Sequence, residues 1–396
     1  MVLKIRSYIP SDRDAVIKLI QRSASTNRTP NTWDQNNMTA ALAFENDTMI
    51  GALPMETRQF EIGNGRSSKV LWISAAHVDE EYRSQGIGAR LDEFIRKNHE
   101  TQIDALCVYR GDVSSLAYKW YNKMNYSPVS TLLSFTKNVA FTKNKNNYFS
   151  IEEISKIQIS EHKILRCFQL NTKQLGGFPK RKIGYWSKLF SAHYYKNNYK
   201  FAIITIPSKD GENYSGYALV GLTSMRDNIS RLEILEFIFS NAMVQELLHQ
   251  SITDYAITLG VKEIRIQIGY DDQLQLWFRQ NGYVKREYST FILVSFLKPL
   301  EYLKNLLKER AICNLLIETE ISQGFVASAV SDSSDIPLSI YMKNEILTKL
   351  LFGRTTAKIA RNEGNLILRK GEEEQFDEFS SVFKPTNWRY FQSDYI

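Results

Sequence analysis

Short apolar runs alternate with longer amphipathic segments over the first part of the chain. Segments 91–95 and 116–124 carry apolar residues at helical spacing, whereas the other runs are short enough to be strands. Ser11 or Asp12 is expected to cap a further helix that contains residues 15–20. This alternation predicts an α/β (α+β) fold, a mixed, twisted sheet with helices on its faces. The strand-like runs are 3–6, 40–44, 49–55, 70–73 and 105–108.

Residues 149–296 repeat this order of elements without repeating the residues. A strand pair around Lys209-Asp210-Gly211 comes first, and a strand, a long helix, another strand and a short helix follow. The pattern predicts a second, degenerate copy of the first domain. The segments are 201–206, 217–222, 232–239, 244–258, 263–268 and 274–280.

The last hundred or so residues predict a third, smaller α/β domain. We expect an amphipathic helix at 300–307, the end of another helix at 348–353, and a strand at 365–368. A chain of 396 residues is long enough for several packed cores. The predicted domains are 1–148, 149–296 and 297–396.

The composition narrows the setting in which the chain works. A net charge of +7 suits an anionic cofactor, but it is too small and too dispersed to indicate nucleic acid. No apolar run reaches the roughly 18 residues of a membrane span. The three cysteines are widely spaced and the five histidines are scattered, so we expect a cytoplasmic protein without a metal site. The basic and aromatic segment 180–200 fits either a single-strand binder or a solvated helix face with an apolar side.

The segment between the strand at 70–73 and the helix at 91–95 carries the strongest chemical signal. It holds Arg83, Gly86 and Gly88, so the order is strand, glycine-rich turn, helix. Backbone N–H groups at a helix N-terminus can hold a diphosphate, and glycines let the anion approach the backbone. The third glycine of a dinucleotide-binding turn and the Gly-Lys-Ser/Thr of a P-loop are both missing. The pattern therefore indicates a diphosphate site of another kind.

Arg83-x-x-Gly86-x-Gly88 resembles the acyl-CoA pyrophosphate loop of the GNAT N-acetyltransferase superfamily. The resemblance implies acetyl-CoA as co-substrate, with its pyrophosphate on this turn and its pantetheine amides paired to the backbone of the preceding strand end. At Ser240–Met243 the second domain lacks such a turn, so we expect no CoA site there. The residues implied in cofactor binding are Ala76, His77, Val78, Arg83, Ser84, Gln85, Gly86, Ile87, Gly88, Ala89 and Ser114.

The segment 114–126 resembles the second motif of that superfamily, which reads roughly Ala-x-x-Φ-Tyr-x-Lys-x-Gly-Phe, with Φ apolar. Tyr121 falls on the tyrosine that often protonates the departing CoA thiolate. Asn125 and Tyr126 replace the usual Gly-Phe, and Asn also accepts a left-handed backbone. Ser114 stands where many members have a CoA-contacting Asn. The alternative is that Tyr121 is a core aromatic residue.

The segments 176–186, 350–353 and 379–396 resemble parts of the enhanced intracellular survival (Eis) acetyltransferases. That resemblance implies a GNAT domain, a degenerate GNAT-like domain and a sterol-carrier-like domain. It also implies that the C-terminal carboxylate, here that of Ile396, serves as the catalytic base. The aromatic, apolar tail predicts docking rather than fraying. His77 is the alternative base.

The predicted function is acetyl-CoA-dependent transfer of an acetyl group to a primary amine of a small molecule, polyamine, aminoglycoside-like compound or lysine. The alternatives are a non-catalytic CoA-binding regulator, a protein lysine acetyltransferase and a tandem GNAT that uses aminoacyl-tRNA. The Arg83 turn counts against the last of these. We expect no nucleic-acid or membrane partner, and a homo-oligomer is an open alternative. Candidate acids for an amine site are Glu45, Asp47, Glu56 and Glu80.

Overall fold

The computed structural model divides the chain into two compact units. Unit 1 consists of Met1–Leu19, Thr39–Thr131 and Thr290–Thr386, and unit 2 of Ile20–Met38, Leu132–Ser289 and Asn387–Ile396. The division into three domains at 148 and 296 is finer and stays a prediction. The residues described are 3–23, 39–74, 76–111, 115–140, 150–153, 157–191, 200–224, 230–269, 271–307, 315–326, 338–389, 391 and 394.

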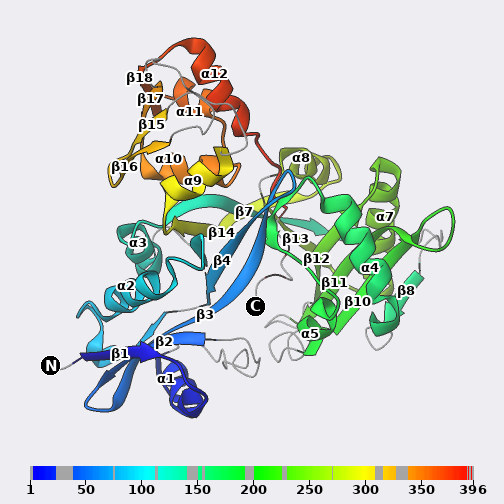
Figure 1. Cartoon of the computed structure of the whole chain (residues 1–396). Coiled ribbons are helices and arrows are strands. Elements are labelled where there is room, and N and C mark those ends of the chain that lie inside the picture. The colour runs from blue at the N-terminus through cyan, green and yellow to red at the C-terminus, as the bar shows by residue number, and fades with distance from the viewer. Residues whose placement is uncertain are drawn as a thin grey trace. The chain divides into compact units, whose positions relative to one another are not determined.

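The main sheet of unit 1 is mixed, as predicted (Figure 1). Neighbouring strands run antiparallel except β4 and β6, which are parallel. The β2–β3 hairpin turns at Asn46-Asp47, as the sequence predicts, but β3 continues well beyond residue 55. The strands in order are β1 (Leu3–Ser7), β2 (Thr39–Glu45), β3 (Thr48–Gly63), β4 (Arg66–Ile73), β6 (Ala105–Gly111) and the end of β14 (Val284–Phe296).

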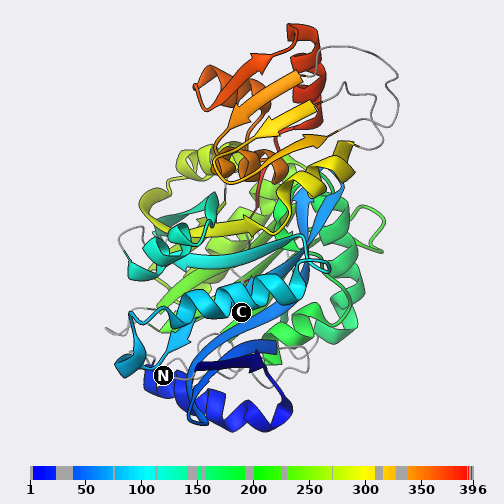
Figure 2. The same ribbon diagram turned by 60° about the vertical axis from the view of Figure 1, so that its left-hand side comes forward.

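Helix α2 (Ile87–His99) covers this sheet, and Figure 2 brings it to the front. Ile87, Leu91 and Ile95 repeat every four residues and are buried against strand residues such as Leu53. Asp12 directly precedes α1, as expected for a cap, but its carboxylate accepts hydrogen bonds from the Ile9 amide and the Arg6 guanidinium. The smaller elements are the turn η1 (Pro10–Asp12), α1 (Arg13–Ser23), β5 (His77–Val78), the turn η3 (Glu80–Tyr82) and α3 (Leu116–Lys123).

Unit 1 also contains a smaller sheet with helices, the α/β element predicted for the end of the chain. It is joined to the main sheet by the Thr386 hydroxyl, which donates to the Ile62 carbonyl at 3.1 Å. The rings of Phe60 and Phe352 meet with centroids 6.3 Å apart. Its elements are α9 (Pro299–Leu307), β15 (Leu315–Glu318), β16 (Gln323–Val326), β17 (Leu338–Met342), α10 (Asn344–Leu351), α11 (Ala357–Asn362), β18 (Leu366–Lys370) and α12 (Glu373–Val382).

Unit 2 repeats the order of the main elements in the first part of unit 1, with β9 and α5 added after its first helix, which confirms the predicted repeat. Its sheet is covered on both faces, because Ile203 packs with α4 and α5 whereas Ile204 packs with α7. Only β12 and β13 among the strand pairs described in this unit are parallel. The strands in order are β8 (Ser150–Glu153), β10 (Lys200–Pro207), β11 (Tyr214–Ser224), β12 (Ser230–Phe239), β13 (Glu263–Ile268) and β7 (Ser127–Asn138). The other elements are α4 (Ile157–Thr172), β9 (Gly176–Pro179), α5 (Tyr185–Ser191), α7 (Ala242–Thr258) and α8 (Asp272–Gln280).

The two units exchange one strand each. Strand β7 follows α3 in the chain but pairs with β13, where Phe135 lies opposite Ile266. Strand β14 follows α8 but pairs with β6, where Val294 lies opposite Cys107. Residues 132–138 of β7 therefore belong to unit 2, although they directly follow a segment of unit 1, and residues 290–296 of β14 belong to unit 1, although they directly follow a segment of unit 2. Among the helices in the described parts of the chain, none is long and apolar enough to span a bilayer.

Candidate functional site

The parallel strands β4 and β6 of unit 1 diverge at their carboxyl ends. Their register ends with Ile73 opposite Val108. The chain that follows β4 stays with β3, where His77 lies opposite Ala52 and Val78 opposite Gly51, while β6 runs on beside β14. The predicted pantetheine-binding strand, β5, is thus paired with β3 along one edge. Its opposite edge faces the side on which β4 and β6 diverge. This geometry is compatible with a ligand that adds to that edge.

The predicted pyrophosphate turn lies between β5 and α2. Ser84 and Gly86 both have left-handed backbones, with φ of 63° and 78°, and Gly86 occupies the N-cap position of α2. The first backbone hydrogen bond of the helix runs from the Arg90 amide to the Gly86 carbonyl at 3.1 Å. The amides of residues 87–89 precede that bond, and Gly86 has no side chain with which to cap them. The turn therefore offers a cluster of N–H donors at the positive end of a helix dipole.

The two glycines of the turn have different surroundings, and that both give an anion access to the backbone stays a prediction. A Cβ on Gly86 would have nothing within 4 Å, so the left-handed φ alone favours glycine there. A Cβ on Gly88 would lie 3.0 Å from Cζ2 of Trp120. Gly88 is therefore required for the close approach of α2 to α3.

Arg83 is directed partly toward its own loop. Its Nε donates to the Val78 carbonyl at 3.3 Å, and its Nη1 lies 4.0 Å from Glu80. The side chain is still 49% exposed, so the guanidinium can turn toward a bound anion. The neighbouring Tyr82 hydroxyl is hydrogen-bonded to the Glu45 carboxylate, which raises the pKa of Tyr82.

Three of the four candidate acids of the amine site have separate partners. Glu45 is bound to Tyr82 and Glu80 lies near Arg83. Glu56 forms a 3.0 Å ion pair with Arg58. Among the residues that the structure describes, no group of three His, Cys, Asp or Glu side chains is placed to hold a metal ion.

Tyr121 lies on α3 and its side chain is fully buried. Its ring is held between Trp120, at a centroid distance of 4.5 Å, and Tyr126, at 5.0 Å. Ser115 caps α3 by accepting a hydrogen bond from the Tyr118 amide at 3.1 Å. The structure therefore places Tyr121 in the core shared by α2 and α3. The predicted site residues Ser114 and Ile396 lie outside the described residues.

Unit 2 differs from unit 1 at the corresponding helix. Helix α7 begins after Asn241, whose side-chain oxygen accepts a hydrogen bond from the Val244 amide at 3.1 Å. A side chain of the protein thus occupies the position at which a ligand anion would meet the helix terminus. The two helix termini differ in whether a side chain caps them, and the Ser240–Met243 segment of the sequence predicts this difference.

The C-terminal segment is docked in unit 2, as its aromatic character predicts. Trp388 and Phe391 are buried. Trp388 bridges to Gly176, and Arg389 donates to the Asp271 carboxylate at 2.8 Å. A small cavity of about 20 Å³ is lined by residues of β12 and β13 and partly by Arg389 and Phe391. The chain's own end thus lines the gap between the parallel strands of this unit.

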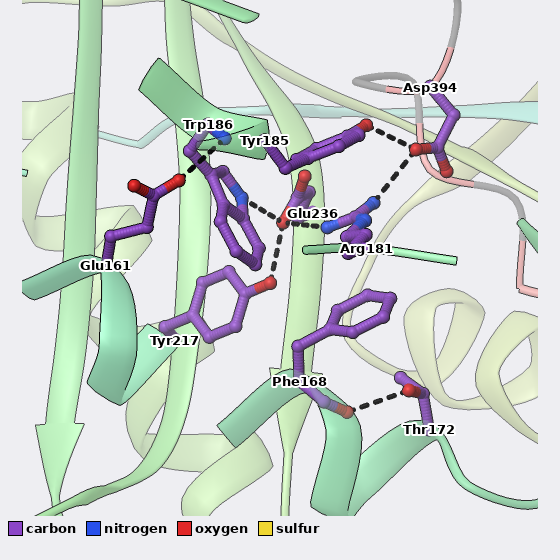
Figure 3. A network of polar contacts seen from close by, with 9 residues as sticks. All are labelled: Glu161, Phe168, Thr172, Arg181, Tyr185, Trp186, Tyr217, Glu236 and Asp394. Carbon is purple, nitrogen blue, oxygen red and sulfur yellow. Dashed lines mark hydrogen bonds and ion pairs between the residues drawn. The ribbon is translucent and has the colours of Figure 1, made fainter. Parts of the chain in front are cut away.

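A buried ionic network holds this segment (Figure 3). Arg181 lies 2.8 Å from Glu236 and 3.1 Å from Asp394, and all three side chains are at most 2% exposed. Tyr185 donates to Asp394, and Tyr217 donates to Glu236 at 2.6 Å. Burial alone lowers the pKa of Arg181, but the two carboxylates outweigh it and raise that pKa well above its usual value.

The described part of the basic–aromatic segment is a solvated face with an apolar side, because Lys182 and Lys188 are exposed whereas Trp186 and Leu189 are fully buried. Arg181 differs from the other basic residues of the segment, since it is an interior residue held by this network. The sequence analysis did not identify Glu236 and Asp394 as partners of Arg181. Asp394 lies 213 positions from Arg181 in the chain, and a local sequence pattern does not indicate such a contact.

No protein-family profile and no curated protein matches this sequence. Solved structures do match its fold. A probable N-acyltransferase from Enterococcus faecalis is 11% identical, with a TM-score of 0.74 over 98% of this chain and 99% of that one. A GCN5-related N-acetyltransferase from Anabaena variabilis is 14% identical, with a TM-score of 0.72 over 98% and 99%. Eis1 from Mycobacterium abscessus is 12% identical, with a TM-score of 0.68 over 99% of both chains. The chain therefore has the fold of the GCN5-related N-acetyltransferases and resembles the Eis proteins along nearly its whole length.

Proposed function

We propose that this protein is an N-acetyltransferase that moves an acetyl group from acetyl-CoA to a primary amine. The observation that carries the proposal is the turn at Gly86, where no side chain caps the first amides of α2. The turn follows β4, which diverges from the parallel strand β6. An anionic diphosphate fits such a helix terminus. The shared fold supports the proposal.

In the proposed reaction the amine nitrogen attacks the thioester carbonyl carbon. A C–N bond forms, the C–S bond breaks, and the CoA thiolate leaves. The attacking nitrogen gives up its proton to a base, Tyr121 donates its phenolic proton to the thiolate, and the proton taken up by the base is returned to Tyr121. The turn and the strand edge at His77–Val78 would hold the donor so that the amine meets the carbonyl in one orientation.

Tyr121→Phe tests the chemical part of this proposal. The ring and its packing between Trp120 and Tyr126 are kept, so acetyl-CoA affinity should stay within about twofold while kcat falls about 100-fold. Initial rates are measured by release of the free CoA thiol. An unchanged kcat would remove Tyr121 from the mechanism.

The acceptor is proposed only as a class: small-molecule amines, polyamines, aminoglycoside-like compounds or lysine side chains. A panel of these amines, assayed by thiol release, identifies it. Binding of acetyl-CoA without transfer to any member would instead indicate a CoA-binding regulator. We further propose that the protein works in the cytoplasm.

The α-carboxylate of Ile396 stays the proposed base. An α-carboxyl has an ordinary pKa of roughly 3.5, so it needs a desolvated setting or a water relay to deprotonate an amine. One residue added after Ile396 would move that carboxylate, and kcat should then fall. An unaffected rate would assign the base elsewhere, with His77 as the next candidate.

A further inference from the structure

Helix α2 carries a stripe of non-apolar residues in addition to its buried apolar face. Gly88, Asp92 and Arg96 are spaced by four, so they lie along one side of the helix. Asp92 is fully buried, whereas charged residues at such positions are normally exposed unless they are paired. The partners of this stripe all belong to unit 1.

The Asp92 carboxylate is used on both of its oxygens. It accepts the Tyr126 hydroxyl at 2.7 Å and the Arg96 Nε at 2.6 Å. Arg96 continues to the Met124 carbonyl at 3.0 Å and to the Ser295 hydroxyl at 2.9 Å. Burial and the adjacent Asp92 carboxylate raise the pKa of Tyr126 well above its usual value, so its hydroxyl remains a donor.

Tyr126 in turn is in contact with Tyr121. Their rings meet edge to face at 5.0 Å and 74°, and the Tyr126 amide donates to the Tyr121 carbonyl at 3.1 Å. On the other side of Tyr121 is Trp120, which packs against Gly88. Gly88 and Asp92 are thus each linked to Tyr121 through one intermediary residue, Trp120 and Tyr126 respectively.

We infer that Asp92 is a positioning residue for Tyr121, acting through the Tyr126 hydroxyl. The inference rests on the proposed function. Helix α2 begins at the turn that would hold the pyrophosphate, so a rigid link from α2 to Tyr121 fixes the distance between the donor's anchor and its proton source. A displacement of an ångström at this point is enough to cost a large factor in rate.

The test compares Tyr126→Phe with Ser295→Ala. Each deletes one hydroxyl and one hydrogen bond to a charged side chain of the same cluster, buried at 2.7 Å for Tyr126 and partly buried at 2.9 Å for Ser295, so each should lower the urea midpoint. Only Tyr126→Phe cuts the link from Asp92 to Tyr121. We expect its kcat to fall about tenfold with the KM for acetyl-CoA within about twofold, and Ser295→Ala to leave both constants near wild type.

A second variant, Asp92→Asn, keeps the shape of Asp92 and leaves Tyr121 and Tyr126 in place. In fluorotyrosine-labelled protein, the ¹⁹F resonance of Tyr121 is identified as the one that disappears in Tyr121→Phe. This resonance should shift or broaden in Asp92→Asn and stay unchanged in Ser295→Ala. Equal loss of kcat in Tyr126→Phe and Ser295→Ala, or no loss in either, would overturn the inference.

If the wild type binds acetyl-CoA but acetylates no amine, the proposed function fails. The ¹⁹F comparison then decides the inference without any turnover: a Tyr121 resonance indifferent to Asp92→Asn rejects it, and a shifted one supports it.

Discussion

The Arg181 network allows a large and specific prediction about stability. Its ion pairs are 2.8 and 3.1 Å long, and the side chains are exposed by no more than 2%. At an effective dielectric constant of about 20, each pair attracts by roughly 5–6 kcal/mol before desolvation is counted. Arg181→Met keeps an apolar stem among the surrounding rings but leaves Glu236 and Asp394 buried without their cation. Breaking a buried pair in this way costs about 3–5 kcal/mol.

The assay is urea unfolding followed by tryptophan fluorescence, with Arg369→Met as matched control. Arg369 also pairs with a carboxylate, Glu318, and also lies over an aromatic ring, at 4.8 Å from the Tyr341 centroid, but it is 47% exposed. An exposed pair contributes about 0–1 kcal/mol. We therefore expect a loss of roughly 4 kcal/mol for Arg181→Met and less than about 1 kcal/mol for Arg369→Met.

A charge-neutral triple variant separates charge from packing. Adding Glu236→Gln and Asp394→Asn to Arg181→Met removes the uncompensated anions, so at least half of the lost stability should return. Equal effects of Arg181→Met and Arg369→Met, or no recovery in the triple variant, would refute the reasoning.

Two further predictions concern the core. Gly88→Ala gains helix propensity but forces Trp120 to move, so we expect the free energy of unfolding in urea to fall by about 1 kcal/mol. Adding Trp120→Phe should recover that loss. A Gly88→Ala variant more stable than the wild type would contradict the tight contact at 3.0 Å. Burial first, and Lys137 second, lower the pKa of His249 to about 4. The unfolded state therefore binds a proton more readily, and about 3 kcal/mol of stability present above pH 6.5 should be lost as the pH falls toward 4. In His249→Leu the free energy of unfolding should depend less on pH between 6.5 and 4. An unchanged pH dependence would assign the titration to another group.

The order of elements is readable from the sequence because it depends on short-range periodicity. The repeat in 149–296 and the turn before α2 were both predicted in this way. The exchange of β7 and β14 was not, because both are apolar strands of similar length and either satisfies the edge of β6 equally well at the level of sequence. Which strand pairs there is decided by contacts far apart in the chain.

The same distinction holds for the site. The left-handed turn at Gly86 has a local signature, and Tyr121 lies in a local motif. The role of Gly88 depends on Trp120, a residue of another helix, and the link from Asp92 to Tyr126 spans 34 positions. These relations are set by packing between elements, which no window of sequence contains.

The central claim is that acetyl-CoA binds at the Gly86 turn, and calorimetry on two glycine variants tests it most directly. Gly86 and Gly65 have similar φ, +78° and +72°, and neither would place a Cβ within 4 Å of other atoms. Alanine should therefore strain both turns equally, by about 1–2 kcal/mol. The account predicts at least tenfold weaker acetyl-CoA binding for Gly86→Ala, about 1.4 kcal/mol, and an affinity within about twofold of wild type for Gly65→Ala. No binding to the wild type at millimolar acetyl-CoA, or equal affinity of the two variants, would contradict it.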